Sequence, residues 1–364
     1  MGLLGQFNKK SLIKKANKLS NQNKYQEALE CYKELLEIDS NYIKAWYNKG
    51  NTFQEIGEHQ KALECYNKAL DLNSKDERVW NSKGVVLVKL GKYDAGIKCY
   101  NKALELNPTF FRSWYNKGNF FFKKLNNYKE AIDCYDKTLK INSKYLNAWI
   151  NKGIVLIKLE LYNESLKSFE KALELDPKNF DALCSKAITL DTIGNYQEAI
   201  KCYNKALKIK PNEIKLWYKK GIGLEELGKY NEAVESFNKA LELYPNDFDV
   251  LFDKGYALTA LEKYQEAIES FDKAIKIKPE NSEVWFNKGA SLGKLGKYPD
   301  SIECFDKALE LDPNDVDAWM GKGVSLKNLK EYQKALEVYD KALELDPTFE
   351  PALKAKEDIL DSES

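Results

Sequence analysis

Cysteine and histidine are the residues in this sequence whose side chains could support redox, metal or nucleophilic chemistry. The chain of 364 residues holds seven cysteines and one histidine. Six of the cysteines share one position of a repeating pattern: Cys31, Cys65, Cys99, Cys134, Cys202 and Cys304. This position holds Ser or Val elsewhere, and equivalent residues a helix diameter apart lie beyond the roughly 7 Å reach of a disulfide. We therefore expect structural thiols here, and a lone thiol at Cys184.

His59 is the only histidine, and it stands where the other nine repeats of the pattern have Tyr. We interpret it as a tolerated ring at the start of a helix. No spacing of Cys, His and carboxylates matches a zinc site, and a single histidine leaves few ways to pair a nucleophile with a base. The sequence predicts no metal, no cofactor and no enzyme; catalysis by carboxylates alone is the enzymatic alternative.

Charge and hydropathy are those of a soluble, helix-forming protein. The chain has 57 Lys and Arg against 56 Asp and Glu, with 31% charged and 43% hydrophobic residues, so nucleic acid is not an expected partner. No apolar run reaches the length of a membrane helix, and the first residues lack the apolar stretch of a secretory signal. We therefore expect a cytoplasmic protein with no membrane partner.

The same residue types return every 34 positions. The seven tryptophans are 34 residues or a multiple of 34 apart, except for one step of 35 between Trp114 and Trp149, and Leu12, Leu183 and Leu251 share their column. This register predicts an N-terminal segment at 1–8, ten tandem units, and a C-terminal capping helix and tail at 350–364. The predicted units span 9–42, 43–76, 77–110, 111–145, 146–179, 180–213, 214–247, 248–281, 282–315 and 316–349.

Each unit is expected to form two helices. Gly, or Ala at Ala16 and Ala187, stands four residues after the Trp column and Leu or Phe seven after it, which makes one stripe of a helix with period 3.6. Because Ala also occurs there, the glycine column requires small size, and close approach of a second helix is the expected reason. Gly57 and its equivalents mark the end of the first helix. A second helix follows, with alternating small and aromatic columns such as Ala62 and Tyr66, and proline ends most units.

The columns W…G…L/F…Y…A…Y/F…A…P over 34 residues resemble the tetratricopeptide repeat, and the resemblance covers residues 9–349. It implies an all-α solenoid, a right-handed superhelix of antiparallel helix pairs whose inside is lined by the first helices. It also implies peptide binding on this inner surface. The departures are local: one extra residue at Leu125-Asn126-Asn127, and Ser in place of the proline at Ser40, Ser74 and Ser143.

A lysine stands three residues after the Trp column in every unit, from Lys15 and Lys49 to Lys322. The tetratricopeptide repeat usually places a large aliphatic residue there. Two interpretations are open. The lysine stem lies over apolar surface with its ammonium group in water, or the lysines form a ladder that binds a ligand.

The expected inner face comprises the residues two before, and one, two, five, eight and nine after, the Trp column. It differs more between units than any other surface. Residues 1–150 carry a net charge of +10 and residues 151–364 a net charge of −9. The N-terminal groove should therefore attract an acidic partner; drift among solvated faces is the alternative explanation of the asymmetry.

Aromatic, Asn and Arg residues of the N-terminal groove suit an extended peptide, because amides can bind its backbone, rings its apolar side chains and Arg a carboxylate. The predicted peptide-binding residues are Asn17, Tyr47, Asn48, Asn51, Arg78, Arg112, Tyr115, Asn116, Asn119 and Phe122. Carboxylate-clamp members of the family grip a terminal carboxylate with five positions over three units. Asn17, Asn48 and Arg78 match these positions, whereas Ile13 and Ser82 stand where cations are expected.

The sequence thus predicts a non-enzymatic scaffold or adaptor whose partners are proteins or peptides, with acidic segments expected. One alternative is a structural protein that self-assembles head to tail, the basic end of one chain meeting the acidic end of another. Another is RNA binding by the basic N-terminal half, which suits that half but not the balanced overall charge.

Overall fold

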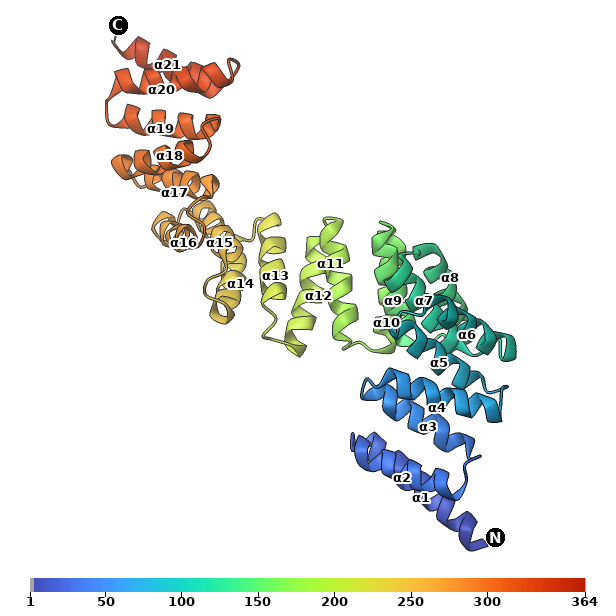
Figure 1. Cartoon of the computed structure of the whole chain (residues 1–364). Helices are drawn as coiled ribbons and strands as arrows, with labels where there is room; N and C mark the ends of the chain where they lie inside the picture. Colours follow the sequence, from blue (N-terminus) through green and yellow to red (C-terminus); the bar gives the residue numbers. More distant parts are fainter. Residues whose placement is uncertain (1–2, 364) are drawn as a thin grey trace. The chain divides into compact units, whose positions relative to one another are not determined.

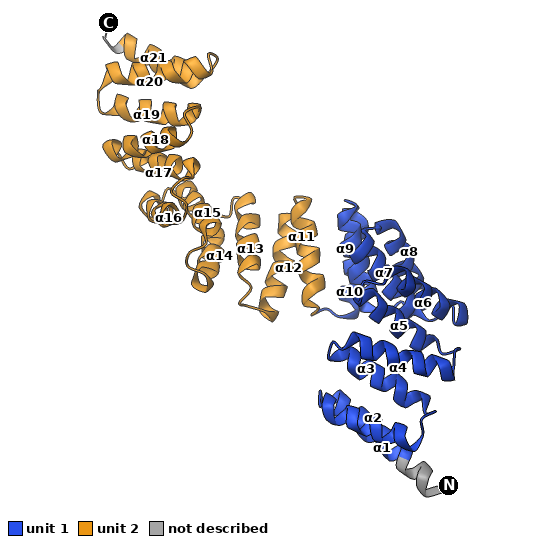
Figure 2. Ribbon diagram, viewed as in Figure 1, with its two compact units in different colours: residues 1–177 blue, residues 178–364 orange. Residues whose placement is uncertain are grey.

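The structure is a computed structural model that describes the backbone of residues 3–363 and the side chains of residues 9–361. The described chain contains 21 α-helices and no strand, which confirms the all-α prediction (Figure 1). It divides into two compact parts, which from here on are called unit 1 (residues 1–177) and unit 2 (residues 178–364) (Figure 2). Each repeat of about 34 residues is called a helix pair. Within the described residues, no helix is both long enough and apolar enough to cross a membrane.

Unit 1 contains ten helices. They are α1 (Leu3–Asn21), α2 (Tyr25–Ile38), α3 (Ile43–Glu55), α4 (His59–Leu72), α5 (Glu77–Lys89), α6 (Tyr93–Leu106), α7 (Phe111–Leu125), α8 (Tyr128–Ile141), α9 (Leu146–Lys158) and α10 (Tyr162–Leu175). Unit 2 contains eleven. They are α11 (Phe180–Thr192), α12 (Tyr196–Ile209), α13 (Ile214–Glu226), α14 (Tyr230–Leu243), α15 (Phe248–Ala260), α16 (Tyr264–Ile277), α17 (Ser282–Lys294), α18 (Tyr298–Leu311), α19 (Val316–Asn328), α20 (Tyr332–Leu345) and α21 (Glu350–Glu363).

Odd-numbered helices from α1 to α19 are the first helices of successive pairs, and even-numbered helices are the second helices. Within each unit, a first helix packs against the second helix that follows it and against the second helix that precedes it. Neighbouring first helices of a unit also touch, as α5 and α7 do. Each unit is therefore a continuous stack of helix pairs, because one pair alone cannot cover its own apolar face.

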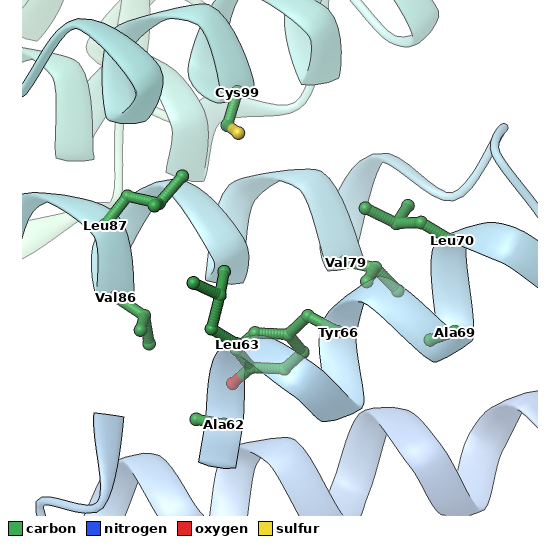
Figure 3. Close-up of a cluster of buried hydrophobic side chains, with 9 residues drawn as sticks. All are labelled: Ala62, Leu63, Tyr66, Ala69, Leu70, Val79, Val86, Leu87 and Cys99. Carbon is green, nitrogen blue, oxygen red and sulfur yellow. The ribbon is translucent and has the colours of Figure 1, made fainter. Parts of the chain in front are cut away.

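An aromatic ring of the second helix lies directly on the glycine column of the first helix. A methyl group added at Gly50 would lie 2.6 Å from Cε1 of Tyr66, and one added at Gly255 would lie 2.4 Å from Cε1 of Phe271. Both rings are fully buried. Figure 3 shows Tyr66 within the core of unit 1, beside Ala62 and Leu63 of its own helix. The glycine column is thus explained by helix approach, as its size requirement predicts.

Each tryptophan ties the start of its first helix to the preceding loop. The indole N–H of Trp46 donates to the carbonyl of Ser40 at 2.8 Å, and that of Trp285 donates to the carbonyl of Pro279 at 2.8 Å. The same bond, always to the residue six positions earlier, forms at Trp80, Trp114, Trp149, Trp217 and Trp319. The Trp and Pro or Ser columns therefore keep a constant spacing because one hydrogen bond joins them.

The lysine column lies on these tryptophans. The ammonium group of Lys83 is 5.1 Å from the ring centroid of Trp80, and the six other tryptophans each have a lysine three residues on within 5.9 Å. Lys288 also forms an ion pair of 2.7 Å with Asp272 on the preceding second helix. Because cation–π contacts and partly buried ion pairs account for these lysines, the column has a structural role.

Left-handed residues end most first helices. Gly57 has φ of +83° and Gly194 has φ of +76°, and the N–H of the residue that follows Gly57 returns to the carbonyl of Phe53. This is the conformation that glycine adopts without steric cost. In the pair that carries the extra residue, α7 extends to Leu125 and Asn126 takes the left-handed position with φ of +49°.

The last helix, α21, covers the end of unit 2. Its Ala352, Ala355 and Ile359 are buried and pack with Tyr339 and Ala342 of α20. On α21 itself, Leu353 and Leu360 remain exposed. The helix thus covers the apolar face that the tenth pair would otherwise expose.

Two glycines of α13 provide a test of the ring contact. A methyl group at Gly221 would lie 2.4 Å from Phe237, whereas one at Gly223 meets nothing closer than 3.6 Å. We expect Gly221→Ala to lower the free energy of unfolding by about 1 to 3 kcal/mol through overpacking. Gly223→Ala should raise it by about 0.5 to 1 kcal/mol, because alanine favours the helix. Urea denaturation followed by circular dichroism measures both; equal effects would contradict the ring contact.

Candidate functional site

The cysteines and the histidine form no reactive constellation in the described structure. Cys65 and the five other cysteines of its column are buried, Cys184 is half-buried, and all seven are free thiols. Burial raises the pKa of the Cys65 thiol to about 11, so it stays protonated and unreactive at neutral pH. Among the described residues, no group of three or more His, Cys, Asp or Glu side chains could hold a metal ion.

Two equivalent clusters in unit 1 combine asparagine amides of first helices with the hydroxyl group of a tyrosine on a second helix. In the first cluster, Oδ1 of Asn17 accepts hydrogen bonds from the hydroxyl of Tyr32 at 2.8 Å and from Nδ2 of Asn48 at 2.7 Å. An amide oxygen has two lone pairs, so both are used. Asn17 can therefore offer a ligand its NH2 group, while Asn48 keeps its own carbonyl oxygen as an acceptor.

The second cluster repeats this arrangement three pairs further on. Oδ1 of Asn119 accepts from the hydroxyl of Tyr135 at 2.8 Å and from Nδ2 of Asn151 at 2.8 Å. The same Nδ2 also donates to the hydroxyl of Tyr115 at 3.0 Å. We call the two clusters the asparagine clusters: Asn17, Tyr32 and Asn48, and Asn119, Tyr135 and Asn151. Each presents an amide NH2 whose orientation its neighbours determine.

A polar pocket of about 490 Å³ opens at the first asparagine cluster. It brings together three of the predicted binding residues, Asn17, Asn48 and Asn51. Asn51 is oriented by the hydroxyl of Tyr66, which donates to its Oδ1 at 2.7 Å. The pocket is also lined by Ser20, Asn21, Asn23, Tyr25, Tyr32 and Glu55. Its chemistry is that of a hydrogen-bonding surface for peptide groups.

Arg78 is held by a partner that the sequence interpretation missed. Its Nε donates to Oδ1 of Asp76 at 3.0 Å and its Nη2 to Oδ2 at 2.7 Å, while its guanidinium lies 5.8 Å from the ring centroid of Tyr47. Burial raises the pKa of Asp76, but the Arg78 guanidinium more than offsets this and holds it below its usual value. The orientation of the Arg78 guanidinium is therefore fixed and its charge is offset by Asp76. Its Nη1 group can still donate hydrogen bonds to a ligand.

The other predicted residues occupy α7 and are partly engaged by protein groups. Nδ2 of Asn116 donates to Oδ1 of Asn81 at 2.9 Å. The ring of Tyr115 packs edge-on against Tyr145 at 4.9 Å. Phe122 packs against Tyr128 at 6.2 Å, and the Arg112 guanidinium lies 6.0 Å from the ring of Phe111. The ten predicted residues thus belong to neighbouring but separate contacts of unit 1.

The asparagine clusters leave a signal in the repeat alignment. Asn stands five residues after the Trp column in three pairs, and each of these pairs has Tyr on its second helix: Asn17 with Tyr32, Asn51 with Tyr66, and Asn119 with Tyr135. Pairs with Phe at that ring position have Ile, Tyr or Ala instead of Asn. Comparing these two columns would have found the tyrosines and, through them, the clusters.

Unit 2 carries a different polar site on α13 and α15. The hydroxyl of Tyr218 donates to Oδ2 of Asp253 at 2.8 Å. Burial raises the pKa of Asp253 to about 6, and the nearby Asp249 and Glu283 add to this. Burial and the charge of Asp253 raise the pKa of Glu225 to about 7. These carboxyl groups therefore share an electronegative environment.

Sequence models of one family match the chain along most of its length. Models described as tetratricopeptide repeat match residues 43–76, 77–110, 99–133, 146–179, 180–213, 218–282 and 286–348, and one described as TPR repeat matches residues 16–57. The chain is a tetratricopeptide repeat protein. The resemblance inferred from its columns is thereby confirmed, and this family is one of protein-interaction modules. No protein with a curated description matches the sequence.

Solved structures of other repeat proteins resemble this tetratricopeptide repeat protein. The C-terminal part of a TPR repeat-containing protein from Cytophaga hutchinsonii is 19% identical and gives a TM-score of 0.57, over 66% of this chain and 98% of that one. YrrB, described as a TPR protein with an unusual peptide-binding site, is 28% identical, with a TM-score of 0.48 over 52% and 97% of the chains. MamA from Desulfovibrio magneticus RS-1 is 23% identical, with a TM-score of 0.45 over 47% and 97%. The first of these likenesses shows a shared fold.

Two tyrosines of the ring column test the asparagine clusters. Tyr135→Phe removes the donor to Asn119 and should lower the free energy of unfolding by about 1 kcal/mol. Tyr339 is also fully buried, but its hydroxyl has no hydrogen-bond partner among the described residues. Tyr339→Phe should therefore raise the free energy of unfolding by about 1 kcal/mol. Chemical denaturation of both variants measures this, and a loss at Tyr339 would contradict it.

Glu225 should make the stability of unit 2 depend on pH. Its pKa in the folded chain, about 7, lies above the ordinary value of 4.5, so the folded state binds the proton more tightly. The stabilising effect of protonation is complete below about pH 4.5 and is lost as the pH rises through 7. Glu225→Gln should raise the melting temperature more at pH 8 than at pH 5. The exposed Glu242 of α14 supplies the control: Glu242→Gln should produce no such difference.

Proposed function

We propose that this protein is a non-enzymatic scaffold of the cytoplasm that binds extended peptide segments of partner proteins, and that unit 1 selects acidic segments. The observation that carries the proposal is the polar pocket at the first asparagine cluster. There the NH2 group of Asn17 and the amide of Asn48 are oriented by neighbours before any ligand arrives. Preorganised donors lose little freedom when they bind a peptide carbonyl, so they favour binding.

Charge supports the choice of an acidic partner for unit 1. Residues 1–177 hold 30 Lys and Arg against 21 Asp and Glu. An excess of positive charge raises the rate at which acidic segments reach the surface and disfavours basic competitors. Glu55, which lines the pocket, is the acidic exception. We expect it to favour a ligand that offers amide or hydroxyl groups rather than a second carboxylate at that end.

Arg78 would bind the peptide carboxylate while it remains paired with Asp76. Its Nε and Nη2 are bonded to Asp76, so an incoming carboxylate would bind the remaining donors. With Asn17 and Asn48, it supplies the three clamp positions that the sequence contains. We propose that these three residues, together with the aromatic ring of Tyr47, hold the end of the peptide.

Opposite net charges on the two units support self-association as a second candidate function. Residues 178–364 hold 27 Lys and Arg against 35 Asp and Glu, the reverse of the excess in residues 1–177. Electrostatic association between chains should weaken as salt is added. Sedimentation velocity at low and high salt separates this candidate from a monomeric scaffold.

Titration of the full chain into a fluorescein-labelled peptide rich in Asp and Glu, with a free C-terminal carboxylate, tests the proposal. We expect Asn48→Ala and Arg78→Ala each to weaken binding by about 1 to 3 kcal/mol, because each removes a hydrogen bond to the peptide. Lys102→Ala on α6 removes a positive charge that is paired with Glu105 on the surface and should leave the affinity within about twofold. Equal affinities for all four proteins, or no binding by the unaltered chain, would contradict the proposal.

A further inference from the structure

The inner face of unit 2 has a different character from that of unit 1. The position five residues after the Trp column is Asn in three of the five pairs of unit 1. In unit 2 it is apolar in every pair: Ile188, Ile222, Tyr256, Ala290 and Val324. Three of these side chains are well exposed, Ile188 at 45%, Tyr256 at 49% and Val324 at 39%. One apolar side chain per pair therefore follows the first helices of unit 2.

Acidic side chains lie beside this apolar stripe. The residue two before the Trp column is acidic and exposed in four pairs of unit 2: Asp181, Asp249, Glu283 and Asp317. The acidic position, two residues before the Trp column, and the apolar position, five residues after it, lie about two helical turns apart and therefore share a helix face. Asp191, Glu225 and Asp253 lie on the same helices, and burial with mutual repulsion raises the pKa of each of the last two. Lys215, Lys219, Lys294 and Lys327 are the basic residues at the corresponding positions of unit 2, so acids exceed bases on this face.

An apolar pocket of about 440 Å³ opens between α17 and α19 at the end of the stripe. Its walls include the rings of Phe286 and Phe305 and the side chains of Met320 and Val324. Ala290 and Gly293 occupy inner-face positions where most other pairs carry larger side chains, which leaves space for the pocket. Gly321 makes room for the ring of Phe305, because an added methyl group would lie 2.4 Å from Cζ of that ring. Asp317, Lys294 and Asn328 also line it. The volume suits one or two bulky apolar side chains, with charged groups beside them.

We propose that the inner face of unit 2 binds a basic segment of a partner protein, anchored by a bulky aliphatic or aromatic side chain in the pocket between α17 and α19. Lysine or arginine side chains of the segment lie over Asp181, Asp249, Glu283 and Glu225, where they offset the excess of carboxylates on this face. The remaining apolar side chains of the segment cover Ile188 and Tyr256. An acidic segment would meet more carboxylates than lysines on this face, so charge complementarity selects the occupant.

This second surface does not depend on the asparagine clusters, because no residue of unit 1 contributes to it. The chain would then carry two recognition faces of opposite preference, one for acidic and one for basic segments. A scaffold with two such faces can hold two partners, or two segments of one partner, at the same time.

Three fluorescein-labelled synthetic peptides of equal length test the proposal with the full chain carrying Asn48→Ala and Arg78→Ala, so that the proposed acidic-peptide site of unit 1 does not contribute to binding. The first combines Lys and Arg with Leu and Phe, the second keeps Leu and Phe but replaces the basic residues by Glu, and the third keeps the basic residues but replaces Leu and Phe by Ser. Fluorescence anisotropy should show the first peptide binding at least about tenfold more tightly than the other two. Equal binding of the first and second peptides, or of the first and third, would overturn the proposal.

Val324→Lys locates the binding site, because it replaces an exposed apolar wall of the pocket by a positive charge. The affinity for the first peptide should fall about tenfold or more. The matched control is Leu311→Lys at the end of α18, which is 43% exposed and does not line the pocket; it should leave the affinity unchanged. Ala290→Leu, which fills the pocket without adding charge, should also weaken binding and serves if the lysine variant fails to fold. An unchanged affinity of Ala290→Leu for the first peptide would contradict the proposal that an apolar side chain of the segment binds in this pocket.

Two further variants test whether the acidic side chains contribute to binding and whether the peptide binds to unit 2. Glu283→Gln combined with Asp317→Asn should weaken binding of the first peptide and reduce its dependence on salt. Asn48→Ala, which alters the pocket of unit 1, should leave binding of this peptide unchanged. A loss of affinity in Asn48→Ala would place the peptide on unit 1 and overturn the proposal, whereas failure of the acidic peptide to bind unit 1 would leave the result for unit 2 intact.

Discussion

The contact between an aromatic ring of each second helix and a glycine or alanine of its first helix is the constraint on which the rest of the structure depends. At Gly50, Gly221 and Gly255 the ring lies so close that no side chain could be added without movement. The ring column therefore sets the distance between the two helices of a pair. Because that distance is constant, the Trp, Lys and Pro columns can form the same contacts in each pair that carries these residues.

Tryptophan and lysine extend this regularity from one pair to the next within a unit. The indole N–H donates a hydrogen bond to the carbonyl six residues earlier, and the lysine ammonium group lies over the same indole ring, as Trp285 and Lys288 show. The lysine departs from the usual aliphatic residue of the family, yet its long stem and charge use both the ring and an aspartate of the preceding helix. The departure is therefore compatible with stacking because the side chain has an apolar and a polar end.

The inner face differs between pairs where the columns vary. The ring column accepts Tyr or Phe, and the choice determines whether the inner face can carry a supported asparagine. Tyr32 and Tyr135 orient Asn17 and Asn119 in unit 1. In unit 2 the rings are mostly Phe, and the inner residues beside them are apolar, as Ile222 and Ala290 are. A ring hydroxyl supports an inner asparagine in three pairs, because it supplies a donor that fixes the orientation of the amide. It does not require an asparagine: the pairs with Tyr100, Tyr203 and Tyr339 have Val85, Ile188 and Val324 at that position.

The sequence by itself determined the all-α fold, the pairing of helices and the size requirement of the glycine column, because periodic burial leaves a periodic record in residue types. It also identified the positions that vary, including Asn17, Asn48 and Asn51. It did not reveal that Asp76 holds Arg78, nor that Asn151 completes the second asparagine cluster, because these contacts depend on side-chain directions and on distances between residues of different pairs. Only the tertiary structure decided which side-chain amide groups hydrogen-bond to other protein groups, since a hydrogen bond forms or fails over differences of a few tenths of an ångström that no repeat pattern records.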